Sequence, residues 1–331
     1  MGSEMCIRDR LAVVALAANT FAQDSDSKTN HAAAVAKRLG KKQTYDLRYK
    51  LKPGDKINYL FEQVVSTQTR MGGEEEQTTS RSQTAKQWDV RNVDSLGNMT
   101  FALKWTSVNM WQQIGDDKPI VYNSKTDTEV PEEYETIADL VGETIAVFSI
   151  KKSGEVISKL SELGESNFGA GEVTIPLPDK PVSLGQRWNI PTVLNATDEN
   201  HKNIRLKARI SYQLTKVDKQ RAFIRFRTEV LTPVKSEKVR STIMQQMTDG
   251  YIVFDMERGY PILRRVEWDE KAQGFQGADS LLTYVGRATE KLKVTRAQAN
   301  KQAGSKLSPL VAQRAKKVEL RTRDAKPLTQ K

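Results

Sequence analysis

Apolar and polar residues alternate along most of the chain from residue 45 onward. Ile57, Tyr59 and Phe61 illustrate the pattern, which is typical of a half-buried β-strand. Such stretches cover residues 57–70, 80–93, 98–114 and 280–294. Each is longer than the usual strand of about five or six residues. Long strands with one polar face predict a broad, curved antiparallel sheet or half-barrel.

One segment departs from the period of two. After Pro131, the apolar residues Tyr134 and Ile137 recur at helical spacing, and Gly142 can end a helix in the left-handed conformation. We therefore expect one internal helix of about three turns over residues 131–142.

The order of strand patterns recurs in the second half of the chain. Residues 88–94 are matched by residues 212–218, and residues 148–154 are matched later by residues 254–259. Two explanations stay open, because a duplicated unit would give such matches and so would any two antiparallel sheets. We place the boundary near residue 172, which gives a first β half over 45–171 and a second over 172–294.

The N-terminus has the pattern of an export signal. Arg8 and Arg10 precede the apolar run 11–18, and small residues precede a cleavage site after Ala22. Residues 1–22 are therefore expected to be removed and the protein exported to the periplasm or the extracellular space. The first ten residues also resemble a translated adapter peptide, which would make them an artefact of gene prediction. The mature chain is expected to contain no transmembrane span.

Charge is concentrated in two flanks. The chain has 52 basic and 41 acidic residues, a net charge of +11. Residues 294–331 account for +8 and residues 24–44 for +3, so residues 45–293 are neutral. A neutral body argues against a specific nucleic-acid groove. We expect a linker with a short helix over 23–44 and a disordered or partly helical tail over 295–331, with an electrostatic anchor to an anionic envelope surface as the alternative for the tail.

No catalytic constellation is present in the sequence. It contains no metalloprotease, serine-hydrolase, phosphate-loop or dinucleotide motif. His31 and His201 stand in polar segments, and Cys6 falls in the predicted signal peptide. We therefore expect no catalytic residue, metal site or cofactor. A hydrolase stays an alternative, and it would require paired carboxylates or a Ser/His pair in a cleft.

The predicted strands carry large apolar residues that suit either of two roles. A curved sheet that closes around a helix can leave an apolar concavity fit for an acyl chain, whereas the same residues can simply fill a core. The candidates for lining such a cavity are Tyr59, Phe61, Phe101, Leu103, Trp105, Ile224, Phe226 and Phe254.

Several short runs between about residues 45 and 294 form a recognisable pattern, and they are Tyr45–Tyr49 with Lys52–Gly54, Trp88 with Gly97–Phe101, Val108–Trp111, Leu177–Val182 and Gly185–Trp188. In these runs the chain resembles an uncharacterised family of exported proteins from planctomycete-type genomes. The family has no assigned activity, so the resemblance implies export and assigns no functional residue. The strand–helix–strand order is also similar to the half-barrel of periplasmic lipoprotein carriers, a likeness of fold that does not imply function.

These observations predict an exported, mainly β protein with one internal helix and two related halves. The expected function is noncatalytic binding of a lipid or another apolar small molecule in the cell envelope. The alternative is a structural or interaction protein that holds an envelope partner through its sheet face and basic tail.

Overall fold

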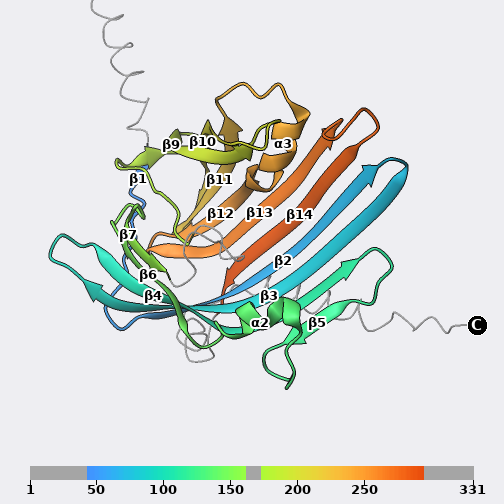
Figure 1. Ribbon diagram of the computed structural model, residues 1–331. Coiled ribbons are helices and arrows are strands. Elements are labelled where there is room, and N and C mark those ends of the chain that lie inside the picture. The colour runs from blue at the N-terminus through green and yellow to red at the C-terminus, as the bar shows by residue number, and fades with distance from the viewer. Residues whose placement is uncertain (1–42, 162–172, 294–331) are drawn as a thin grey trace, which may run out of the picture. The chain divides into compact units, whose positions relative to one another are not determined.

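The computed structural model describes residues 43–161 and 173–293 (Figure 1). The predicted signal peptide and basic tail lie outside the described residues, as does nearly all of the predicted linker and the proposed boundary at residue 172.

Twelve strands form one open antiparallel sheet. Its order is β7-β6-β4-β3-β2-β14-β13-β12-β11-β10-β9, and β5 pairs with β4. A separate two-stranded sheet contains β1 and β8. The bounds are β1 Thr44–Tyr45, β2 Lys56–Met71, β3 Glu74–Val93, β4 Met99–Ile114, β5 Ile120–Asn123, β6 Thr144–Ile150, β7 Val156–Ser161, β8 Val182–Ser183, β9 Arg187–Thr197, β10 Asn203–Asp218, β11 Arg221–Val230, β12 Asp249–Asp255, β13 Tyr260–Gln273 and β14 Leu281–Leu292.

The predicted fold class is confirmed. The four long strands expected from alternation are β2, β3, β4 and β14, and the sheet curves without closing into a barrel (Figure 1). Strand β3 begins six residues before its predicted start, because Glu74–Thr79 pair with β2 beyond a turn at Gly72 and Gly73. Both faces of that stretch are polar, so alternation gives no signal there.

The expected three-turn helix is shorter than predicted. The segment contains a 3₁₀ turn, η1 (Glu132–Tyr134), and one α-helical turn, α2 (Glu135–Ala138). The helix ends early because the chain turns back to β4, where the Gly142 amide donates to the Trp105 carbonyl at 2.7 Å. Contact with the sheet replaces the last helical turns.

A second helix, α3 (Glu237–Ile243), corrects the expectation of a single internal helix. The Ser236 hydroxyl caps it by accepting a hydrogen bond from the Val239 amide. Its buried face, which includes Ile243, packs on Leu194 of β9 and Leu206 of β10. A 3₁₀ turn, η2 (Met244–Gln246), continues it.

The helix α3 and the turn η2 also cover the free edge of β9. The Gln246 amide donates to the Asn195 carbonyl at 2.7 Å and accepts from the Asn195 amide at 3.1 Å. The Thr242 hydroxyl accepts from the Thr197 amide at 3.1 Å. These side chains satisfy backbone groups that a neighbouring strand would otherwise pair.

The largest core cluster joins the inner faces of both halves and contains two cross-strand rows of aromatic rings. One row crosses β2, β3, β4 and β6, and the other crosses β9, β10 and β11. Ring centroids within each row are 4.7–6.0 Å apart, a spacing at which aromatic pairs attract. The rows are Tyr59–Trp88–Phe101–Phe148 and Trp188–Tyr212–Phe226.

The two halves also share a pair of backbone hydrogen bonds between a turn and the second long strand of each half, which is β3 in the first half and β10 in the second. In each half, a glycine in a left-handed turn donates to the second strand, and the next residue accepts an amide from it. The bonds are Gly54 to Val90 at 2.8 Å and Val90 to Asp55 at 2.9 Å, then Gly185 to Leu214 at 2.7 Å and Leu214 to Gln186 at 3.1 Å. A duplicated unit would have these correspondences, and common origin stays a prediction.

Candidate ligand-binding cavity

A cavity of about 610 Å³ lies at the seam between the two edges of the sheet. One side is formed by β6 and β7, and the other by β9. Residues 173–179, which lead from the first half into the second, run between them. The edge strands β7 and β9 do not pair with each other within the described residues, so the seam leaves room for a ligand.

The floor of the cavity is apolar. Leu103 of β4 lies opposite Ala146 of β6, and Phe148 of β6 lies opposite Phe101 of β4 in the core. Leu103, Ala146 and Phe148 therefore point to the inner face, where they line the cavity. They are buried because alternation along both strands places them against the core. This floor can contact a hydrocarbon chain, and its side chains have no group that could form a hydrogen bond with a polar ligand.

The connecting segment is held by hydrogen bonds to the β6–β7 turn and to Tyr49, all in the first half of the chain. The Leu177 amide donates to the Ser153 carbonyl at 2.7 Å, and the Thr174 hydroxyl donates to the Gly154 carbonyl at 2.8 Å. The Ile175 amide donates to the Tyr49 hydroxyl at 2.9 Å. The segment therefore forms a defined wall.

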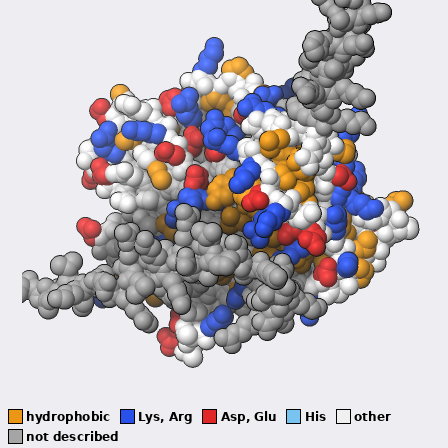
Figure 2. All heavy atoms as spheres, turned by 180° about the vertical axis from the view of Figure 1, so that it is seen from behind, with side chains coloured by type: hydrophobic (Ala, Val, Ile, Leu, Met, Phe, Trp, Pro, Cys, Tyr) orange, Lys and Arg blue, Asp and Glu red, His pale blue; other side chains and the backbone are white. Residues whose placement is uncertain are grey.

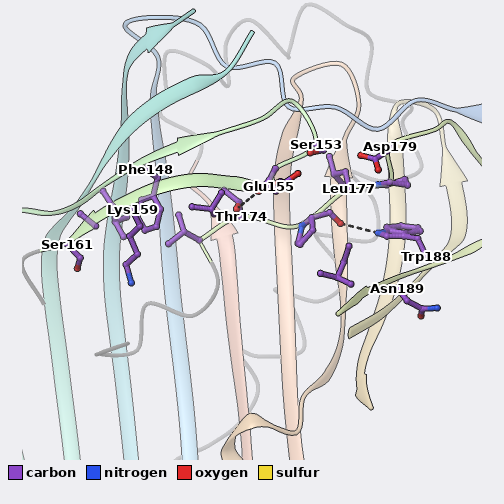
Figure 3. Close-up of a pocket in the computed structure, with 18 of the residues that line it drawn as sticks. Phe148, Ser153, Glu155, Lys159, Ser161, Thr174, Leu177, Asp179, Trp188 and Asn189 are labelled. Carbon is purple, nitrogen blue, oxygen red and sulfur yellow. Dashed lines mark hydrogen bonds between the residues drawn. The ribbon is translucent and has the colours of Figure 1, made fainter. Parts of the chain in front are cut away.

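Trp188 forms the wall on the β9 side. Its ring stacks on Tyr212 with centroids 5.5 Å apart, and its indole N–H donates to the Pro176 carbonyl at 3.1 Å. Two residues on, Ile190 also lines the cavity. Figure 3 shows Thr174 and the connecting segment between Phe148 and Trp188. Both contacts of Trp188 fix its ring, so the width of the cavity is set before any ligand arrives.

The rim contains polar and charged side chains. Glu155 forms an ion pair with Lys151 at 2.9 Å. Lys159 lies opposite Phe148 on β7, lines the cavity and has no ion-pair partner in the part of the chain that the structure describes. An ammonium group above an apolar floor can bind an anionic headgroup while the hydrocarbon of the same molecule lies on the floor.

The cavity contains no recognisable catalytic or metal-binding arrangement among its described residues. Residues 43–161 and 173–293 contain no group of three or more His, Cys, Asp or Glu side chains that could hold a metal ion. His201 lies in the turn between β9 and β10 and does not line the cavity. The arrangement therefore supports binding and offers no assigned chemistry.

A buried ion pair lies elsewhere on the inner face of the sheet. Lys86 Nζ is 3.2 Å from a carboxylate oxygen of Glu290 and 4.0 Å from the centre of the Phe61 ring. Burial lowers the pKa of Lys86, Arg264 lowers it further, and Glu290 opposes both. The interior of this sheet is therefore not wholly apolar.

The structure separates the eight sequence candidates into three places. Leu103 lines the cavity at the seam. Phe61 and Trp105 line a second cavity of about 320 Å³ against the segment of η1 and α2. The remaining five are buried in the main core, and they are Tyr59, Phe101, Ile224, Phe226 and Phe254.

Sequence reasoning missed most of the cavity wall. Alternation along β6 and β9 assigns Ala146 and Ile190 to the inner face, whereas β7, which carries Lys159, has no such pattern. Alternation also does not show that β7 and β9 approach each other. Trp188 was one of five tryptophans that could line a cavity, and nothing in the sequence singled it out from the other four. The prolines of residues 176–181 indicated a connection between halves and gave no sign that it forms a wall.

No helix in the described part of the chain is long and apolar enough to cross a membrane.

No protein-family model matches the chain, and no curated protein matches it in sequence. Among solved structures, it is similar to a chain of the structure described as "Lipid-protein interactions in lipovitellin", with 11% sequence identity and a TM-score of 0.46. The similarity covers 74% of this chain and 26% of that chain, so this chain spans about a quarter of its length. We draw no function from a similarity at this level.

Proposed function

We propose that the protein binds one amphiphile with a hydrocarbon chain and an anionic head, such as a fatty acid, in the cavity between β7 and β9. The observation that carries the proposal is the apolar space of about 610 Å³ between two unpaired sheet edges. Its volume is within the range of about 300–1,000 Å³ that small-molecule sites occupy.

The shape of the site orients the ligand. The headgroup would lie at Lys159 on the rim, and the chain would extend over Phe148 and Ala146 towards Trp188. Each methylene group transferred from water to such a surface contributes about 0.8 kcal/mol before the cost of immobilising the ligand. Binding would therefore depend mainly on chain length, with a smaller contribution from the headgroup.

The proposal includes noncatalytic action in the cell envelope. Export rests on the signal pattern of residues 1–22, and the absence of a catalytic role rests on the lack of a recognised motif in the sequence. The alternative of a structural or interaction protein predicts a chain that takes up no amphiphile.

The proposal is tested by titrating the chain with dansyl-undecanoic acid and monitoring the dansyl fluorescence. Ile190→Trp fills the cavity from β9, and Val193→Trp adds the same ring to an exposed position of the same strand. We expect I190W to abolish uptake and V193W to retain it. Lys159→Gln should lower the affinity for the probe by about threefold to tenfold, the loss expected for one charge-assisted contact that is partly exposed to solvent. Equal uptake by I190W and the unsubstituted chain would overturn the proposal.

A further inference from the structure

The second half carries an excess of basic side chains on the outer face of the sheet, although residues 45–293 as a whole are neutral. Alternation along β10 buries Leu206, Ala208 and Ile210 and leaves the residues between them on the outside. We call six outward residues of β9, β10 and β11 the basic face, and they are Arg187, Arg205, Lys207, Arg209, Arg225 and Arg227.

Two carboxylates partly neutralise the basic face. Glu229 pairs with Arg209 at 2.7 Å, and Asp249 of β12 contacts Arg227 at 2.7 Å and Arg225 at 3.5 Å. The other three cations, Arg187, Arg205 and Lys207, form no ion pair within the described ranges. Six cations against two anions leave a local charge of +4, which attracts anionic surfaces.

Exposed apolar side chains stand among these cations. Val193 is 40% exposed and lies opposite Lys207, and Leu231 is 53% exposed and donates its amide to the Lys207 carbonyl at 2.8 Å. Tyr251 is 39% exposed and lies opposite Arg225. Aliphatic and aromatic tips among Lys and Arg are typical of surfaces that contact the headgroup layer of a membrane.

The remaining charge of the body favours one orientation. Residues 115–143, which contain β5, η1 and α2, have nine acidic and two basic residues. An anionic surface would repel that region and attract the basic face. Figure 2 shows, from behind, hydrophobic side chains exposed among charged ones on the described surface.

We propose that the basic face docks on an anionic phospholipid membrane. The exposed aliphatic tips of Val193 and Leu231 suit a lipid headgroup layer, whereas a site for single-stranded nucleic acid would stack successive bases on several aromatic rings and this face exposes one, Tyr251. Trp188 and Ile190 of β9 line the cavity while Arg187 of the same strand belongs to the basic face. Docking would therefore bring the cavity close to the membrane. Docking itself does not depend on the proposed cavity ligand.

Flotation of the full chain with vesicles tests this inference. The vesicles contain phosphatidylglycerol and phosphatidylcholine, or phosphatidylcholine alone. One variant replaces Arg187, Arg205 and Lys207 by Gln. The matched control replaces three exposed cations of the first half by Gln, and these are Arg91, Lys118 and Lys125. Both variants lose three charges and keep the C-terminal tail, so their difference reports the basic face.

We expect the face variant to bind anionic vesicles at least about tenfold more weakly and the control to change by less than about twofold. Thermal melting verifies folding, and Lys207→Glu alone gives the same test if the triple variant does not fold. Equal losses in the two triple variants, or equal binding to both kinds of vesicle, would overturn the inference.

A second pair of measurements distinguishes a membrane from a soluble polyanion. The double variant Val193→Ser, Leu231→Ser should weaken vesicle binding and leave binding to dextran sulfate unchanged. Unchanged vesicle binding by this variant would indicate that the basic face binds a soluble polyanion, and it would overturn the proposal that the face docks on a membrane. Uptake of dansyl-undecanoic acid without vesicles is measured separately, so failure of docking and failure of the cavity proposal give different results.

Discussion

The buried ion pair between Lys86 and Glu290 allows a stability prediction that combines geometry with charge. The side chains are 3% and 14% exposed, and their charged atoms are 3.2 Å apart. Glu290→Gln removes the carboxylate while the Lys86 ammonium stays buried near Arg264. Removing one partner of a buried pair costs about 3–5 kcal/mol, because the remaining charge loses the attraction of that counter-charge. We expect E290Q to lose that much free energy of unfolding.

Two variants make the magnitude interpretable. Glu62→Gln removes the carboxylate of an exposed pair between β2 and β14, where Lys291 is 3.3 Å away, and should cost less than about 1 kcal/mol. The double variant Lys86→Met, Glu290→Gln removes both charges of the buried pair. We expect it to be more stable than E290Q, because no ammonium is then left buried at residue 86.

The same pair predicts a pH dependence. Burial lowers the pKa of Lys86 in the folded state, so between that value and the unfolded value the unfolded chain binds more protons. Stability due to this group therefore rises with pH across that window, and its cost is fully present below it. Glu290 raises the pKa of Lys86, so E290Q should lower it further and extend the window downwards.

Urea unfolding followed by tryptophan fluorescence, between pH 7 and 10, measures both effects. We expect the stability difference between E290Q and the unsubstituted chain to narrow as the pH rises. A loss below about 1 kcal/mol at pH 7, or a double variant as unstable as E290Q, would refute the reasoning.

Two further predictions concern the supports of the fold and the cavity. Ser236→Ala removes the cap of α3 and should cost about 1 kcal/mol in urea unfolding; an unchanged midpoint would contradict the capping role. Gly154→Ala places a Cβ 2.3 Å from the Ile175 carbonyl oxygen, in a residue whose φ is +80°. The variant should therefore destabilise the chain and weaken its binding of dansyl-undecanoic acid. Gly274→Ala is the matched control, since it has a similar φ of +78° and its nearest atom is 4.0 Å away. Equal effects of the two glycine variants on probe binding would contradict the wall described for residues 173–179.

Alternation predicted the sheet because each long strand has one face on the core. Ile57, Tyr59 and Phe61 are all buried, as their spacing indicates. The helix α3 was missed because only a few of its positions contact the sheet, so its apolar pattern is short. The helix after Pro131 was overestimated because Val141 continues the helical spacing yet contacts Trp105 of β4 instead.

The cavity was less accessible to sequence reasoning than the fold. Alternation shows that Leu103 and Phe101 share the inner face, but only the approach of distant strands decides which of them meets empty space. Phe101 stacks between two other rings and fills the core. Leu103 lies where the core ends at the seam. This distinction depends on how far the sheet curls, and no local spacing reports it.

Native mass spectrometry of the chain secreted from a bacterial host, followed by solvent extraction and lipid analysis, tests the central claim most directly. The account predicts one amphiphile per chain, present in the unsubstituted protein and in V193W and absent from I190W. A clean apo mass, together with no uptake of dansyl-undecanoic acid, would contradict it and favour an interaction protein with a filled seam.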